Sequence, residues 1–276
     1  LEIVMPHVPI IPIVTLIILF IFIMQQMGTG KIGKFFGPFM LLWFLMLGTL
    51  GSLNIHLCPG IFKAFNPWWA IKLLCTNPEW FLILGAVFLC TTGAEALYSD
   101  LGHCGRKNIS VSWIFVKIML ILNYLGQGAW LLSSPKDAGI NPFYGIMPEW
   151  FTFIGVIMST GAAIIASQAL LSGSFTIFSE AMNLVLWPKL KIKYPSREKG
   201  QLYIPAVNWA LLAGCLLTVL IFRDSSHMEA AYGLAITITM LMTTVLLTFY
   251  LHSLNVNIVI CSAFIIFFGI IEGVFF

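Results

Sequence analysis

Long uninterrupted apolar runs constrain this chain more than any other feature. Crossing the hydrocarbon core of a bilayer takes about 20 apolar residues in a helix, and eight segments meet or nearly meet that length. They cover residues 8–25, 35–53, 80–98, 109–132, 150–171, 203–222, 230–251 and 256–276. The sequence therefore predicts an all-α, polytopic helical membrane protein.

The composition supports this prediction. Hydrophobic residues make up 59% of the 276 residues and charged residues only 9%, whereas about 25% of the residues of a soluble domain are charged. So few charges cannot cover the surface of a compact soluble fold, so the remaining surface must face lipid. No cluster of catalytic residues converges, and no Cys or His spacing is typical of a metal site. We therefore expect no enzyme and no cofactor.

Basic residues predict the orientation of the chain in the membrane. Loops on one side of the predicted spans carry nine Lys and Arg, and loops on the other side carry four. The basic side is expected to be cytoplasmic, which places the Leu1 end outside the cytoplasm. The basic stretch at 191–193 is therefore interpreted as a topology signal between two spans, and no nucleic-acid partner is expected. The chain begins without Met and ends inside an apolar run, which predicts an internal fragment.

Three loop features leave alternatives open. Residues 175–187 are apolar and either extend the fifth span or form a short interfacial helix. Residues 67–69, Pro-Trp-Trp, are expected to form an interfacial element because tryptophan prefers the headgroup level. Cys58 and Cys75 share one loop, where a disulfide is one option in an oxidising compartment.

Charged residues inside predicted spans are costly in lipid and indicate function. Glu95 and Lys117 are the clearest cases, while Glu180 and Glu272 are weaker because each is close to a predicted helix end. Lys117 either extends its ammonium group to the headgroups or pairs with a carboxylate such as Glu95 or Asp100.

The run from Thr91 to Glu95 predicts a broken helix. Gly93 costs about 1 kcal/mol relative to Ala inside a helix, and the hydroxyls of Thr91 and Thr92 can compensate freed carbonyls. Such a break exposes carbonyl oxygens that coordinate cations near the bilayer midplane. The Glu95 carboxylate would balance the charge or take up a proton if burial raised its pKa. The alternative is that Glu95 lies at the cytoplasmic end and extends into the headgroups.

A polar face is expected on the fourth predicted span. Asn123, Tyr124 and Gln127 contribute the polar groups, and Gly126 and Gly128 allow a close approach. In membranes such residues often join helices, so packing is the favoured interpretation and ion binding the alternative.

Five motifs, in order along the chain, resemble the KUP/HAK/KT potassium uptake permeases. They are TGAEALYSDLGH at 92–103, LNYLGQGA at 122–129, IASQA at 165–169, GQLYIPAVNW at 200–209 and AAYGLA at 230–235. The resemblance implies a LeuT-like inverted-repeat transporter of the APC superfamily with about twelve helices. Residues 1–276 would then be a partial transporter domain holding eight of them, family helices 4 to 11. The first helices and a cytoplasmic C-terminal domain would lie outside the chain.

The resemblance also implies a function and a site. It implies K⁺ uptake across the bacterial inner membrane, as K⁺/H⁺ symport by alternating access. Thr92, Gly93 and Glu95 would bind the ion, and Glu95 would couple protons. Secondary candidates are Thr91, Tyr98, Asp100, Asn123 and Gln127. The expected partners are K⁺, H⁺ and the lipid bilayer, with a homodimer left open.

Two other transport classes compete with this interpretation. Another secondary transporter of the same fold would carry a different cation or an amino acid. An acidic residue directly after the predicted break favours a cation over an amino acid, whose carboxylate would need free helix N-termini. A K⁺ channel would need a filter of the Thr-Val-Gly-Tyr-Gly type, which the sequence lacks.

Overall fold

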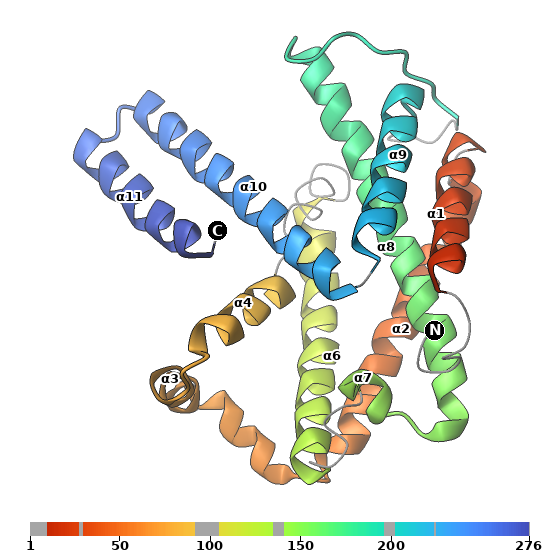
Figure 1. The fold of residues 1–276 in the computed structure, drawn as a ribbon, viewed down its shortest axis with the longest axis vertical. Coiled ribbons are helices and arrows are strands. Elements are labelled where there is room, and N and C mark those ends of the chain that lie inside the picture. The colour runs from red at the N-terminus through yellow and green to blue at the C-terminus, as the bar shows by residue number, and fades with distance from the viewer. Residues whose placement is uncertain are drawn as a thin grey trace. The chain divides into compact units, whose positions relative to one another are not determined.

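The computed structural model describes residues 10–27, 30–91, 105–134, 141–195, 202–223 and 225–275. These residues form helices joined by turns, with one isolated antiparallel bridge between Lys193 and Tyr203. The elements are α1 (Ile10–Met27), α2 (Gly30–Ile55), the 3-10 helix η1 (Pro59–Phe65), α3 (Pro67–Thr76), α4 (Trp80–Thr91), α6 (Arg106–Ser133), α7 (Pro142–Gly145), α8 (Glu149–Asn183), α9 (Pro205–Phe222), α10 (Ser225–Ser253) and α11 (Ile258–Phe275), drawn in Figure 1.

Within the described ranges, five helices are long and apolar enough to cross a membrane. They are Gly33–Ile55, Lys107–Ser133, Glu149–Asn183, Pro205–Phe222 and His227–Ser253. Three shorter apolar helices are Ile11–Gln26, Trp80–Cys90 and Ile258–Val274. Each of the eight predicted segments therefore coincides with an apolar helix, which confirms an all-helical polytopic membrane protein. The last part of the third predicted span, 92–98, lies outside the described residues.

The chain divides into two compact units. The first comprises Leu1–Lys72 and Gly93–Leu216, and the second comprises Leu73–Thr92 and Leu217–Phe276. The first unit contains α1, α2, α6, α7, α8 and most of α9, and the second contains α4, α10 and α11. Each unit is described separately below.

In the first unit, two glycines bring α2 and α6 into backbone contact. A methyl group built on Gly51 would lie 2.5 Å from the carbonyl carbon of Leu122 and 2.6 Å from the Cα of Asn123. A methyl group on Gly126 would lie 2.5 Å from the Cα of Gly51. Neither position has room for a side chain, so the close approach of these two helices requires glycine at both places.

Two buried amides attach α1 to α8 and α9 in the same unit. Gln168 on α8 donates a hydrogen bond to the Ile21 carbonyl at 3.4 Å, and Asn208 on α9 donates one to the Phe22 carbonyl at 3.3 Å. Around them Ile21 and Phe22 pack with apolar residues of α8 and α9, including Leu171 and Leu212. Polar side chains that bond across helices are a common means of joining helices in lipid. Gln168 thus has a packing role here.

Helix α8 continues through the region whose structure the sequence left open. It runs without interruption from Glu149 to Asn183, 35 residues, or about 52 Å at 1.5 Å per residue. The first alternative is therefore correct for residues 175–183, which extend the fifth span. A helix this long exceeds a hydrocarbon core of about 30 Å and must tilt or project beyond it. Glu180, near its end, is exposed.

The structure also describes the loop that contains the Pro-Trp-Trp segment, Cys58 and Cys75. The Pro-Trp-Trp segment begins a short helix, α3, that has no buried residue, and the Lys72 ammonium lies 5.5 Å from the ring centre of Trp69. Cys58 and Cys75 are both free thiols, so the structure does not contain the disulfide that was one option for this loop.

In the second unit, α10 and α11 lie side by side and are joined by a short turn (Figure 1). Cys261 of α11 is buried. Three polar residues described in these two helices are also buried: Thr237, Thr244 and Glu272.

Candidate functional site

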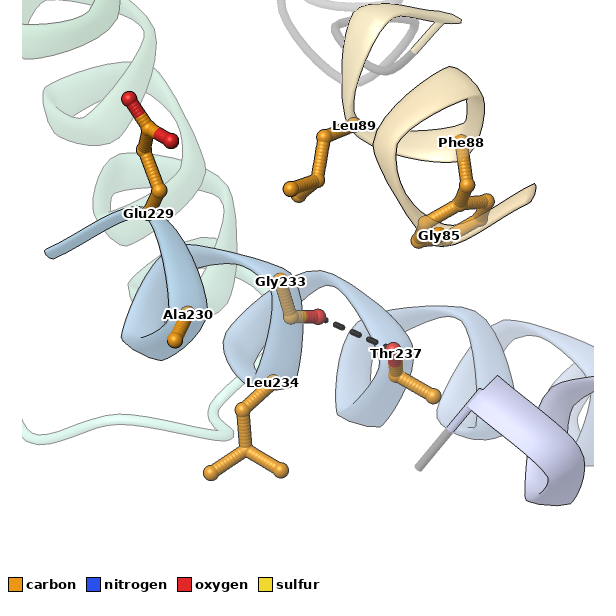
Figure 2. Close-up of a pocket in the computed structure, with 8 residues that line it drawn as sticks. All are labelled: Gly85, Phe88, Leu89, Glu229, Ala230, Gly233, Leu234 and Thr237. Atoms are coloured by element: carbon orange, nitrogen blue, oxygen red, sulfur yellow. Dashed lines mark hydrogen bonds between the residues drawn. The ribbon is translucent and has the colours of Figure 1, made fainter. Parts of the chain in front are cut away.

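A cavity of about 300 Å³ lies between α4 and α10 in the second unit. Gly85, Phe88 and Leu89 line it from α4, and Glu229, Ala230, Gly233, Leu234 and Thr237 line it from α10 (Figure 2). Glycine on both helices keeps this space open. A methyl group built on Gly85 would meet no atom within 4 Å, and one built on Gly233 would lie 3.2 Å from Leu89 Cδ2.

The polar groups of the cavity are oxygens on α10. The Glu229 carboxylate extends from the first turns of the helix, and the Thr237 hydroxyl donates to the Gly233 carbonyl at 2.9 Å (Figure 2). Carboxylate, hydroxyl and carbonyl oxygens can replace part of the hydration shell of a cation. Sequence reasoning missed Glu229 because it immediately precedes the apolar run that was taken to start at residue 230. Its position one residue before the AAYGLA motif was the available signal.

Most of the predicted ion-binding residues lie outside the described part of the chain. This applies to Thr92, Gly93, Glu95, Tyr98 and Asp100. Thr91 is the last described residue of α4, and the rest of the predicted run follows it in the sequence. The roles of these predicted residues in ion binding, and the predicted helix break, stay predictions.

Asn123 and Gln127 lie on α6 in the first unit. Asn123 is buried against α2 beside Gly51, and no hydrogen bond is made by its Oδ1 among the described residues. Gln127 is half-buried. The contact with Gly51 supports the packing interpretation of Asn123, and ion binding by either residue stays a prediction.

Lys117 lies on the exposed side of α6. Its ammonium group is 5.2 Å from the ring centre of Trp113, one turn closer to the start of the helix. A cation over an indole ring is a favourable electrostatic contact. The ammonium group thus lies toward the start of α6. Glu95 and Asp100 lie outside the described residues, so extension to the headgroups and pairing with a carboxylate both stay predictions.

Comparison with known proteins places the chain in a family. The family described as "K+ potassium transporter integral membrane domain" matches residues 1–276. The chain belongs to this potassium transporter family. It is 56% identical over 259 residues to "Probable potassium transport system protein Kup" of Flavobacterium psychrophilum, which covers 91% of the chain and 40% of the relative. No solved structure matches the chain.

Relatives of the same printed name occur in other organisms. A protein of the same name from Cytophaga hutchinsonii is 59% identical over 238 residues, covering 84% of the chain and 36% of the relative. One from Streptococcus agalactiae is 56% identical over 260 residues, covering 93% and 39%. The chain therefore spans about two fifths of the length of these relatives. The resemblance read from the five motifs is confirmed, and the relatives are named as transport proteins, not enzymes.

Besides Glu229, a second acidic residue of this potassium transporter chain, Glu272, is of interest because its side chain is buried. Glu272 on α11 is buried, and its Oε1 accepts a hydrogen bond of 2.7 Å from the Thr244 hydroxyl on α10. Its Oε2 has no hydrogen-bond partner among the described residues. Glu272 was a weak functional candidate from sequence because it is near the end of its span. Its position in the span does not reveal that Thr244 of the neighbouring helix contacts it.

Replacing Thr244 with Val should destabilise the contact between α10 and α11. The change keeps the shape but removes the donor to Oε1, so neither carboxyl oxygen of Glu272 then has a hydrogen-bond partner among the described residues. Leaving a buried acceptor unsatisfied costs about 1–3 kcal/mol. We expect a lower Tm of the detergent-solubilised protein. Thr243→Val is the matched control, because the exposed Thr243 hydroxyl bonds only to the Thr239 carbonyl of its own helix. An equal Tm for the two variants would contradict the prediction.

Proposed function

We propose that the protein containing this chain carries K⁺ across the membrane. The match of the potassium transporter family to residues 1–276 carries this proposal, and the relatives' name, potassium transport system protein, supports it. The cavity between α4 and α10 supports it further, because its polar groups are oxygens and include one carboxylate. Oxygen ligands of this kind suit a monovalent cation that has lost its water.

The proposed mechanism is K⁺/H⁺ symport by alternating access in a LeuT-like fold. Thr92, Gly93 and Glu95, which follow α4 in the sequence, would bind K⁺. Carbonyls freed by the proposed break would coordinate the ion, and Glu95 would take up the coupled proton. The cavity between α4 and α10 would be part of the ion path, with Glu229 raising the local cation concentration.

The proposed location is the bacterial inner membrane, with the Leu1 end outside the cytoplasm. The count of basic residues in alternate loops supports this orientation. The direction of Lys117 agrees with it, since its ammonium group is directed toward the start of α6, where Arg106 and Lys107 follow one another. Headgroups on the basic side are the expected neighbours of such a side chain.

Growth of a K⁺-uptake-deficient bacterium at low K⁺ tests the transport proposal. The full-length gene that encodes this chain should restore growth and ⁸⁶Rb⁺ uptake, and no rescue would contradict K⁺ transport. Uptake of Na⁺ or of an amino acid by the expressed protein, without ⁸⁶Rb⁺ uptake, would favour the other transporters of the same fold.

Two substitutions separate the proposed roles of Thr92 and Glu95. Thr92→Val removes one oxygen ligand and should raise the KM for K⁺ by about tenfold, the equivalent of 1.4 kcal/mol. Glu95→Gln removes the proton acceptor and should abolish the pH dependence of uptake. An unchanged KM would remove Thr92 from the ion site, and an unchanged pH dependence would remove Glu95 from proton coupling. Thr243→Val, at an exposed hydroxyl of α10 that bonds to the Thr239 carbonyl of its own helix, serves as the control that should leave both unchanged.

A further inference from the structure

The connection between α8 and α9 carries lysines on one side and apolar residues on the other. Lys189, Lys191 and Lys193 are exposed, whereas Leu190 and Ile192 between them are partly buried. This alternation is that of an extended chain with one face packed on a core. The three ammonium groups therefore leave the same face of the segment, with alternate residues about 6.6 Å apart.

Backbone and packing contacts hold this extended segment in place. Lys193 and Tyr203 exchange two backbone hydrogen bonds of 2.8 and 2.9 Å, and the Leu190 N–H donates to the Met182 sulfur at 3.1 Å. Leu190 and Ile192 pack on a cluster formed by Phe175, Met182, Tyr203, Ile204 and Val207. Since Phe175 and Met182 belong to α8 and Val207 to α9, the lysines are fixed relative to the ends of two membrane-spanning helices.

Directly before the lysines, an apolar turn is exposed. The exposed fractions are 68% for Leu184, 86% for Val185, 75% for Leu186 and 48% for Trp187. Val185 has a positive φ of 60°, which is uncommon for a β-branched residue and ends α8 abruptly. The Trp187 ring meets the Phe178 ring edge-on at 5.5 Å. Four consecutive apolar residues at the end of a span are stable when they lie in the headgroup region, where tryptophan is preferred.

We propose that residues 184–193 form a docking surface for anionic phospholipid headgroups of the surrounding bilayer. Leu184, Val185, Leu186 and Trp187 lie at the boundary between acyl chains and headgroups. The ammonium groups of Lys189, Lys191 and Lys193 bind lipid phosphates. The surface binds phosphatidylglycerol-type lipids in preference to zwitterionic ones.

Position and charge favour lipid over other polyanions. The segment follows one membrane span at Asn183 and precedes another at Pro205, so it lies at the membrane surface. Within the described ranges none of the three lysines forms an ion pair with a carboxylate. Clusters of basic residues next to membrane spans attract anionic lipid, by about fivefold in affinity for each lysine near the surface. The apolar turn has no comparable role toward a nucleic acid.

Lipid retention by the full-length protein tests this inference. The protein is reconstituted into nanodiscs of equal parts phosphatidylglycerol and phosphatidylcholine, extracted gently, and its retained lipids are counted by native mass spectrometry. The wild type should prefer phosphatidylglycerol. Combining Lys189→Gln, Lys191→Gln and Lys193→Gln should reduce that preference by at least about tenfold. Because these side chains are exposed, the variant should keep the wild-type Tm.

A matched charge control distinguishes a docking surface from net charge. Combining Lys63→Gln, Lys72→Gln and Lys136→Gln removes the same charge from loops on the other predicted side and should leave the preference intact. An unchanged lipid preference in the triple variant of Lys189, Lys191 and Lys193 would overturn the inference. An equal loss of preference in this variant and in the control variant would overturn it too. Crosslinking of Lys191 to a protein segment in the lipid-filled particle would also overturn it, in favour of a protein partner.

Discussion

Gly51→Ala should destabilise the protein by about 3 kcal/mol, a cost at the upper end of typical overpacking. The added methyl group would overlap the Leu122 carbonyl and lie 2.6 Å from the Cα of Asn123. These are backbone atoms, so no side-chain rotation can relieve the clash and the two helices must move apart. Thermal unfolding of the solubilised protein measures the effect.

Gly126→Ala should have a similar effect for the same reason. Its methyl group would overlap the Gly51 carbonyl on α2. Because both substitutions force apart one contact, the double variant should cost less than the two single costs added together. Additive costs would contradict a shared contact between these two glycines.

Gly33→Ala is the matched control on the same helix. A methyl group at Gly33 meets no atom within 4 Å, and replacing glycine by alanine inside a helix usually gains up to about 1 kcal/mol. The control should therefore leave the Tm unchanged or raise it. A drop in Tm as large as that of Gly51→Ala would mean that glycine is needed in α2 for a reason other than the contact with α6.

The spans could be predicted from sequence because their signal is local. A run of apolar residues long enough for a bilayer has few structural alternatives, and all eight predicted segments contain a helix. The ends of the helices are harder to predict from sequence, because apolar character does not determine where a helix ends. Residues 175–187 illustrate this point: the helix continues past Glu180, and only at Asn183 does α8 end.

The sequence could predict which residues make contacts between helices, but not which residues they meet. The sequence indicated that Gly126 allows a close approach, but not that Gly51 is the residue it meets. The same limit applies to Glu272, whose burial depends on Thr244 of a different helix. The cavity between α4 and α10 also required tertiary structure, since nothing in either helix alone shows that Gly85 and Gly233 line a common space.

The proposed ion path predicts a large effect from filling that cavity. Gly233→Phe would place a ring in the space between α4 and α10, where the Gly233 Cβ would point toward Leu89 at 3.2 Å. Leu89 is flexible at its end, so the helix can accept the new side chain while the cavity fills. If K⁺ passes through this space, uptake should fall by an order of magnitude or more, because an apolar constriction excludes water and ions.

Uptake of ⁸⁶Rb⁺ at equal protein level in the membrane measures this effect. Gly269→Phe on α11 is the matched control, since a methyl group there meets no atom within 4 Å. The control should transport normally, and Gly233→Ala should fall between the two. A Gly233→Phe variant that is well folded by Tm and still transports at the wild-type rate would place the K⁺ path elsewhere. The family assignment would remain unaffected, because it rests on the sequence and not on the cavity.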